Sequence, residues 1–141
     1  MTEPPLLVHA SSVAFRGRGL LITGPSGSGK SGLTLQLMAL GADLVADDQT
    51  ELIARGGRLI ASPPATTAGL IEARYLGLMN VPFLRHADIA LVLDMGRIET
   101  ERLPPERTIR LAGITCALAY CPPTPHLAAS ILCWLAHGRH A

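Results

Sequence analysis

The chain has 141 residues and a mass of 14.9 kDa, the size of one domain, which we expect to span residues 1–141. Apolar residues make up 48% of it and charged residues 16%, which excludes an intrinsically disordered chain. A formal net charge of +1 and an aromatic content of 4% argue against nucleic acid as a partner, because they leave neither a basic surface nor base-stacking rings.

The sequence also argues against a membrane or secreted protein. No apolar run approaches the roughly 20 residues of a membrane-spanning helix, and residues 1–7 lack the basic start of a signal peptide. The chain has three cysteines, Cys116, Cys121 and Cys133, which are too few for a disulfide framework. We therefore expect these cysteines to be small buried apolar residues of a cytoplasmic protein. Lys30 is the single lysine beside eleven arginines, which indicates a specific task for its ammonium group.

The predicted elements begin with a hairpin that leads into a buried strand. Residues 13–15 and 20–23 are apolar and are separated by turn residues, which predicts two paired strands. A loop over residues 24–29 precedes a helix over residues 30–40, where leucines recur at helical spacing. Gly41 is suited to cap the C-terminal end of that helix.

The middle of the chain predicts a short strand over residues 44–46 and then a second hairpin. Residues 51–54 and 58–61 form its two strands around a pair of glycines. A proline-bearing loop leads to a further strand over residues 69–73, and the stretch 75–81 is predicted to be irregular.

The last third of the chain predicts strands and one helix. A continuous apolar strand over residues 89–93 ends at Asp94, and the polar stretch 97–106 predicts a solvated connection. Residues 108–120 are strand-like, and a helix is expected over residues 126–137. Strands that alternate with few helices, together with hairpins, predict an α/β domain with a mixed sheet.

The loop before the first helix matches the pattern G-x-x-x-x-G-K-[ST] at every position. Glycines let backbone N–H groups turn inward around phosphate oxygens, and the following helix directs its positive end at the same anion. A lysine neutralises the outer phosphates, and a serine offers its hydroxyl to Mg²⁺. We therefore predict a nucleotide-phosphate site formed by Gly24, Pro25, Ser26, Gly27, Ser28, Gly29, Lys30 and Ser31.

A second motif overlaps this loop. Gly27, Gly29 and Gly32 fit the dinucleotide fingerprint G-x-G-x-x-G, and Asp47 follows Gly27 by twenty residues, where a ribose-binding acid would stand. The eight-position phosphate loop is the more specific pattern, and a dinucleotide-binding turn has no use for a lysine followed by a serine. We therefore prefer the phosphate loop.

A phosphate loop of this kind needs a carboxylate at a neighbouring strand end. Asp94 matches the strand-terminal aspartate of P-loop ATPases, whereas Asp47 and Asp48 suit an enzyme that activates a hydroxyl. Two adjacent acids can divide their roles, one as a ligand of Mg²⁺ and the other as a proton acceptor. The residues alone leave this choice open.

The run from His9 through the phosphate loop to Asp48 resembles the catalytic domain of HPr kinase/phosphorylase, and residues 71–81 look like that family's signature segment. These blocks stand in the family's order over residues 8–95. The resemblance implies a P-loop fold of the phosphoenolpyruvate-carboxykinase type. It also implies a serine kinase of the phosphocarrier protein HPr that uses ATP or pyrophosphate and Mg²⁺, with a reverse reaction of phosphate on phosphoserine, and a hexamer.

The resemblance assigns catalytic roles to four residues. Asp47 would be the base toward the serine hydroxyl and the acid in the reverse direction, with Asp48 as the second member of the pair. His9 would lie near the reacting groups, and Lys30 would hold the phosphates. These roles are expectations from the family pattern.

The resemblance also implies metal ligands and a role for the signature segment. Ser31, Glu72 and Asp48 would bind the metal. Arg74 and Asn80 fall inside the signature segment, which in the family contributes to the reverse reaction and to subunit contacts.

The chain departs from the family pattern in three places. Tyr75 stands where the signature usually has glycine, and Arg85 and His86 come early in place of a basic, glycine-containing loop. The chain also begins almost at the catalytic block, as expected of a short form without an N-terminal domain. These departures bear on the reverse reaction and on the protein substrate more than on ATP binding.

Two other functions stay open. A small-molecule or nucleotide kinase usually carries an arginine-rich lid, which the arginines between residues 97 and 110 could imitate, although glutamates are interleaved with them. The alternative from another class is a nucleotide-binding regulatory module with little turnover, whose bound state is sensed by a partner.

Overall fold

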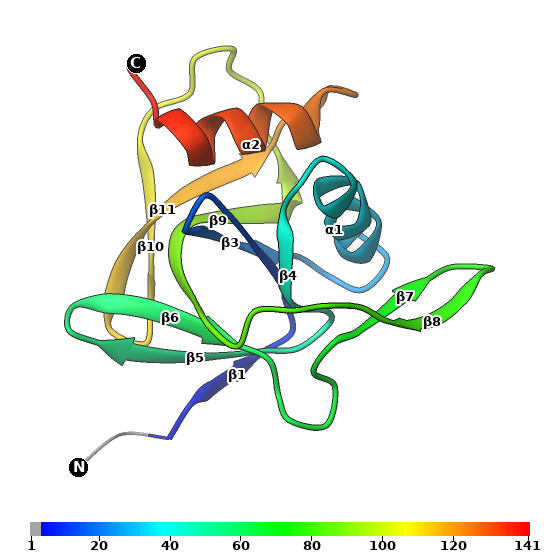
Figure 1. Cartoon of the computed structure of the whole chain (residues 1–141). Coiled ribbons are helices and arrows are strands. Elements are labelled where there is room, and N and C mark those ends of the chain that lie inside the picture. The colour runs from blue at the N-terminus through cyan, green and yellow to red at the C-terminus, as the bar shows by residue number, and fades with distance from the viewer. Residues whose placement is uncertain (1–3) are drawn as a thin grey trace.

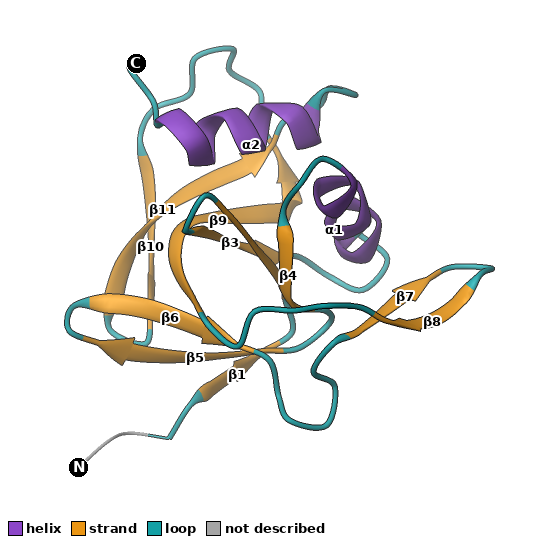
Figure 2. Cartoon of the chain, in the orientation of Figure 1, coloured by secondary structure: helices purple, strands orange, loops and turns teal. Residues whose placement is uncertain are grey.

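The computed structural model describes residues 4–141, which form a curled mixed β-sheet, a separate two-stranded hairpin and two α-helices (Figures 1 and 2). The first part of the chain contains β1 (Leu6–Val8), β2 (Ser11–Phe15), β3 (Arg18–Thr23), α1 (Lys30–Ala39), β4 (Asp43–Ala46), β5 (Thr50–Arg55) and β6 (Arg58–Ser62). The second part contains β7 (Leu70–Ala73), β8 (Gly77–Asn80), β9 (Ala87–Ile98), β10 (Arg107–Leu111), β11 (Ile114–Cys121) and α2 (Leu127–His137). Neither helix within residues 4–141 is long and apolar enough to cross a lipid bilayer.

The centre of the sheet is parallel and its margins are antiparallel. β9 runs parallel to both β3 and β11, whereas β2 lies antiparallel between β3 and β4. β1, β5 and β6 continue the sheet in antiparallel pairs from the start of β9, and β10 pairs antiparallel with β11. The predicted α/β fold with a mixed sheet is confirmed.

This topology determines where functional residues meet. Because β2 is antiparallel to both neighbours, the carboxyl ends of β3 and β4 lie at the same edge, on either side of the start of β2. The register places Ser11 opposite Ile22 and Ser12 opposite Ala46. The loop after β3, the acids after β4 and the residues that open β2 therefore converge.

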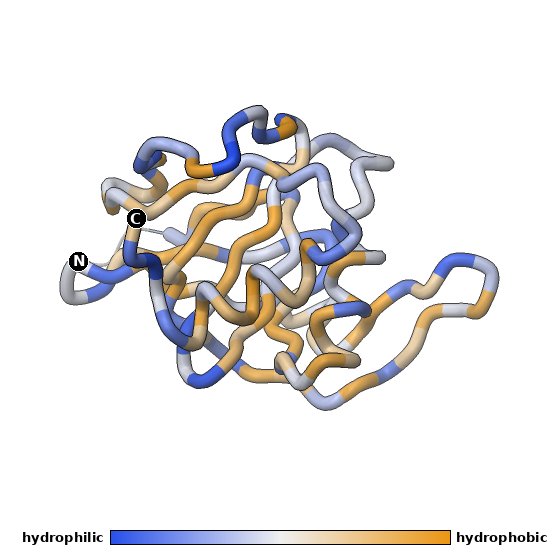
Figure 3. The backbone as a smooth tube through the Cα atoms, turned by 90° about the horizontal axis from the view of Figure 1, so that it is seen from above, coloured by the Kyte–Doolittle hydropathy of each residue, from blue (hydrophilic) through white to orange (hydrophobic). Residues whose placement is uncertain are grey.

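Alternation along β3 divides the core into two layers. Leu20 and Ile22 face one side of the sheet, where both helices pack, and Leu21 faces the other side. Figure 3 shows apolar segments running through the interior of the molecule. The helix layer also contains Leu33, Leu37, Ile131, Leu132 and Leu135, and the opposite layer contains Val45, Leu52, Leu59 and Val92.

The predicted irregular stretch 75–81 is wrong, because β8 pairs antiparallel with β7 in a separate hairpin. In Figure 1 this hairpin projects away from the body of the molecule. Tyr75 stands at its tip with a φ of 66° and is fully exposed, as are Leu76 and Leu78 in large part. The hairpin buries so little of its side-chain surface that no alternation of apolar and polar residues marks it as a strand.

The strand predicted over residues 89–93 is longer than expected. β9 covers twelve residues, so Asp94 lies inside it and not at its end. The strand continues beyond Leu93 because Asp94 is in register with Thr23 of β3 and Tyr120 of β11, and Ile98 is in register with Cys121 of β11.

Two further predictions of the last third need correction. The strand-like stretch 108–120 is a hairpin, in which Ala112 and Gly113 adopt positive φ angles between β10 and β11. The connection expected to be solvated buries Glu99, whose carboxylate accepts hydrogen bonds from Arg107. An oppositely charged partner lets this carboxylate be buried.

The cysteines are all unpaired, as predicted, but they differ in burial. Cys116 is buried, Cys121 is partly buried and Cys133 is exposed on α2, so the expectation of three buried residues holds only in part. Burial raises the pKa of the Cys116 thiol and of the Cys121 thiol.

Candidate functional site

The glycine-rich loop connects the end of β3 to the start of α1. Gly24, Gly27 and Gly29 all have positive φ angles, of 142°, 83° and 97°. A Cβ on Gly24 would lie 2.8 Å from the Ser28 hydroxyl oxygen, so only glycine fits there without displacing the loop. The helix after the loop begins at Lys30, and its unpaired N–H groups point toward the loop.

Lys30 holds this loop through two hydrogen bonds to its backbone. Its ammonium group donates to the carbonyl oxygens of Gly24 at 2.8 Å and Pro25 at 3.0 Å, and the side chain is almost completely buried. A lysine in this position places one positive charge beside the backbone of the glycine-rich loop. The structure therefore places the single lysine of the chain where the loop pattern predicts it.

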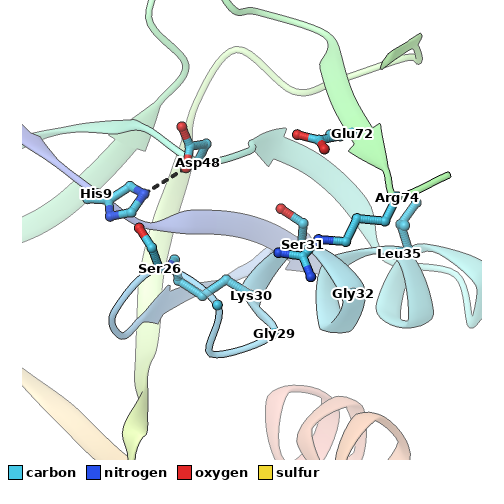
Figure 4. Close-up of a pocket in the computed structure, with 11 residues that line it drawn as sticks. His9, Ser26, Gly29, Lys30, Ser31, Gly32, Leu35, Asp48, Glu72 and Arg74 are labelled. Atoms are coloured by element: carbon cyan, nitrogen blue, oxygen red, sulfur yellow. Dashed lines mark hydrogen bonds and ion pairs between the residues drawn. The ribbon is translucent and has the colours of Figure 1, made fainter. Parts of the chain in front are cut away.

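A pocket of about 410 Å³ opens above the loop (Figure 4). It brings together residues from the loop, from the corner before β2, from the turn after β4 and from β7. The lining residues are His9, Ser26, Gly27, Gly29, Lys30, Ser31, Gly32, Leu35, Asp48, Glu72 and Arg74. Most residues that the sequence analysis selected therefore face one space.

Asp47 and Asp48 are adjacent in sequence but occupy different environments. Asp47 is 8% exposed and does not line the pocket. Its Oδ1 accepts hydrogen bonds from the Ser11 hydroxyl at 2.9 Å and the Ser31 hydroxyl at 2.8 Å, and its Oδ2 accepts the Glu72 N–H at 3.4 Å. A carboxylate engaged in this way holds neighbouring groups in place, and the dinucleotide interpretation, which needs it free for a ribose, gains no support.

Asp48 faces the pocket. Its side chain is 68% exposed, and Oδ1 lies 2.7 Å from Nε2 of His9. Figure 4 shows the two side chains pointing toward each other beside the loop. The Gln49 N–H donates to the Asp47 carbonyl at 2.8 Å, which closes a three-residue turn and holds Asp48 at a φ of 68°. Strained backbone of this kind is concentrated at functional sites.

Glu72 of β7 and Arg74, in the turn that follows β7, line the same pocket. In Figure 4 Glu72 lies above Ser31, and the Arg74 side chain extends across α1 toward Ser31. The hydrogen bond from the Glu72 N–H to Asp47 connects this strand to the acid pair. Asn80 stands at the other end of the hairpin, opposite Leu70, and does not line the pocket.

Asp94 lies outside the pocket, although it is in register with Thr23, the last residue of β3. Its Oδ1 accepts the Gly96 N–H at 2.8 Å, and its Oδ2 is 4.0 Å from the Arg97 side chain. The arginines between residues 97 and 110 do not form a lid over the described pocket either. Arg107 is bound to Glu99, and Arg97 donates to the Tyr120 hydroxyl.

Sequence reasoning missed Ser11, which contacts both acids, and Leu35, which lines the pocket from α1. The one available signal for Ser11 is a hydroxyl at the start of a strand that is otherwise buried. That signal is weak because its partners are 36 and 37 residues away.

The chain was compared with known families, proteins and structures. The family model described as HPr Serine kinase C-terminal domain matches residues 3–102. The HPr kinase/phosphorylase of Clostridium tetani is 42% identical over 95 residues, which are 67% of this chain and 30% of that protein. The HPr kinase/phosphorylase of Geobacillus thermodenitrificans is 38% identical over 107 residues, covering 70% of this chain and 35% of that protein.

The fold is also similar to a solved structure. The Hpr(Ser) kinase/phosphatase from Coxiella burnetii matches with a TM-score of 0.78 and 27% identity over 93% of each chain. The chain spans about a third of the length of the curated relatives that it matches.

Proposed function

The chain belongs to the family of HPr serine kinase C-terminal domains, and from this premise we propose that it transfers the γ-phosphate of ATP to a serine of the phosphocarrier protein HPr. One observation carries the proposal: the phosphate loop and the His9–Asp48 pair line a single pocket. A phosphate donor and a hydroxyl acceptor would meet there. The fold class of the family member from Coxiella burnetii supports the same assignment.

The loop would bind the β- and γ-phosphates through its backbone N–H groups and the N-terminus of α1. Lys30, which now donates to Gly24 and Pro25, would turn its ammonium group toward the outer phosphates. Its place in the lining of the pocket, next to the loop backbone, supports this role.

Magnesium fits the oxygen donors of the pocket. The Ser31 hydroxyl and the carboxylates of Glu72 and Asp48 are hard ligands on its wall. Within residues 4–141 no three His, Cys, Asp or Glu side chains form a metal cage, which suits an ion held mainly by one or two carboxylates and phosphate oxygens. When bound, the ion would neutralise charge on the phosphates.

We assign the proton acceptor to Asp48, where the family resemblance pointed to Asp47. Asp48 is exposed to the pocket and is oriented by His9, whereas Asp47 is buried and already accepts two hydroxyl donors on one oxygen. In this mechanism the serine oxygen attacks the γ-phosphorus, the bond from phosphorus to the ADP oxygen breaks, and the serine proton passes to Asp48. Asp47 holds the Ser31 hydroxyl in place beside the phosphates.

The reverse reaction uses the same groups. Inorganic phosphate attacks the phosphoserine phosphorus, the bond to the serine oxygen breaks, and Asp48 returns a proton to that oxygen, which yields pyrophosphate and HPr. A cytoplasmic location and a hexameric assembly belong to the same proposal. Light scattering after size-exclusion chromatography tests the assembly, with six chains as the expected result.

The central experiment is mass spectrometry of HPr after incubation with this chain, ATP and Mg²⁺. We expect one added phosphate on a serine and none when that serine is replaced by alanine. ATP binding without any transfer to HPr would contradict the kinase function and would favour a regulatory nucleotide-binding module.

A further inference from the structure

Ser11 is a buried hydroxyl that contacts both acids of the site. It opens β2, is 0% exposed, and donates to Asp47 Oδ1 at 2.9 Å. The same oxygen atom accepts the backbone N–H of Asp48 at 3.2 Å. We propose that Ser11 is a positioning residue that holds Asp47 and Asp48 in their separate roles, an inference that rests on the proposed kinase function.

The corner that carries Ser11 is fixed by further hydrogen bonds. The Ala10 carbonyl accepts the Thr50 hydroxyl at 2.9 Å, and the Ser12 hydroxyl lies 3.1 Å from the same Thr50 oxygen. Ser12 and Thr50 are themselves fully buried. The backbone before Ser11 is therefore anchored to the start of β5 through the Ala10 carbonyl, whereas Ser12 contributes only a bond between side chains.

His9 and Ser11 hold Asp48 from two directions. His9 contacts its carboxylate at 2.7 Å, and Ser11 accepts its backbone N–H. A non-glycine residue pays a conformational cost for a φ of 68°, so this backbone needs an interaction that selects it. The Gln49 N–H bond to the Asp47 carbonyl and the Ser11 hydroxyl both support this φ. Without the Ser11 hydroxyl only the turn bond remains, so Asp48 relaxes more readily to an ordinary φ, which would swing its carboxylate away from the acceptor position.

The contact with Asp47 adds a second effect of the same hydroxyl. Ser11 and Ser31 donate to one carboxylate oxygen, so together they define the side-chain orientation of Asp47. Loss of the Ser11 donor leaves the carboxylate held by the Ser31 hydroxyl and by the long bond from the Glu72 N–H, so its orientation can shift. A misplacement of about 1 Å in a catalytic constellation costs on the order of 100-fold in rate.

The test compares Ser11→Ala and Ser11→Cys with Ser12→Ala. Ser12 is the matched control, because it is the next residue in the same strand, is equally buried, and makes no contact with either acid. We expect kcat for transfer to HPr to fall about 10- to 100-fold in both Ser11 variants, with KM for ATP changed less than about threefold. Ser12→Ala is expected to keep kcat within about twofold, although its melting temperature should fall by about as much as that of Ser11→Ala.

Amide hydrogen exchange gives a readout that does not depend on turnover. We expect the Asp48 N–H to exchange at least about tenfold faster in Ser11→Cys, which preserves side-chain volume, and to be unchanged in Ser12→Ala. Equal kcat values in the Ser11 variants and the wild type, or equal losses in Ser11→Cys and Ser12→Ala, would overturn the positioning role while leaving the kinase function intact. A wild-type chain that transfers no phosphate would instead refute the proposed function, and the positioning role with it.

Discussion

His9 and Asp48 lie 39 positions apart in the chain, yet Nε2 of the imidazole is 2.7 Å from Oδ1 of the carboxylate. The contact forms because β2 lies between β3 and β4 and starts where both of those strands end. The histidine comes just before β2, and the aspartate follows β4. The phosphate loop leaves β3 at the same edge, so one sheet edge supplies both a phosphate cradle and an oriented carboxylate.

Replacing Asp48 with asparagine should remove the proton acceptor and one candidate magnesium ligand while leaving the phosphate loop intact. Asparagine tolerates the left-handed φ that this position requires, so the turn is expected to persist. We expect kcat for phosphate transfer to HPr to fall at least about 100-fold. Affinity for ATP, measured by calorimetry without metal, should change less than about threefold, because the loop amides and Lys30 remain in place.

Asp43→Asn is the matched control for Asp48→Asn. Asp43 opens β4, is exposed, and lies outside the pocket. Its variant should retain wild-type kcat. If Asp48→Asn were as active as Asp43→Asn, Asp48 would not be the proton acceptor.

Asp47→Ala should mainly destabilise the fold. The substitution leaves the buried Ser11 hydroxyl and the partly buried Ser31 hydroxyl without their acceptor. An unsatisfied buried polar group costs about 1–3 kcal/mol, and we expect a loss of that size in the free energy of unfolding, measured by urea denaturation. Asp48→Asn, at an exposed side chain, should stay within about 0.5 kcal/mol of the wild type. Similar losses in both variants would mean that the two acids do not differ as their burial indicates.

Lys30→Met should abolish tight nucleotide binding while retaining most of the aliphatic stem. Methionine cannot donate to phosphate oxygens, and charge-assisted hydrogen bonds are the strongest available in such a cradle. The dissociation constant for ATP, measured by calorimetry, is expected to rise at least about tenfold. Arg58→Met serves as the control. This variant also removes one positive charge, but Arg58 pairs with Asp88 away from the pocket. Equal affinity in the wild type and Lys30→Met would refute the role of Lys30.

The sequence was most informative where function depends on local geometry. The phosphate loop between β3 and α1 follows from consecutive residues, since glycine φ angles and a helix start are local properties. The helix over residues 30–40 and the second hairpin were recognisable for the same reason. The different environments of Asp47 and Asp48 could not be predicted from the sequence. Adjacent residues in a turn differ in burial only through their partners in other strands.

Long-range pairing explains the remaining differences. β9 continues past Asp94 because β11 still pairs with it, at Cys121 and Ile98, and no pattern within residues 94–98 indicates this. The strand predicted over residues 69–73 is confirmed as β7, whereas β8 has little buried surface and so leaves no periodic pattern in the sequence. Ser11 acquires its role only when β2 is placed beside β4.

The ion pair between buried Glu99 and half-buried Arg107 leads to a prediction about pH. Arg107 donates to both carboxylate oxygens, at 3.3 and 3.1 Å, and these hydrogen bonds are the main reason that the pKa of Glu99 lies below its ordinary value. A carboxylate with a lowered pKa in the folded state stabilises the fold above the ordinary glutamate pKa of about 4.3, and this contribution is lost as the pH falls through the folded-state value. Glu99→Gln should therefore lower the melting temperature at pH 7, and its difference from the wild type should shrink as the pH falls through the folded-state pKa of Glu99. Glu106→Gln, at an exposed glutamate, is the control and should match the wild type across the same pH series. A difference between Glu99→Gln and wild type that stayed constant down to the lowest pH at which the chain folds would show that the pair acts through packing and not through charge.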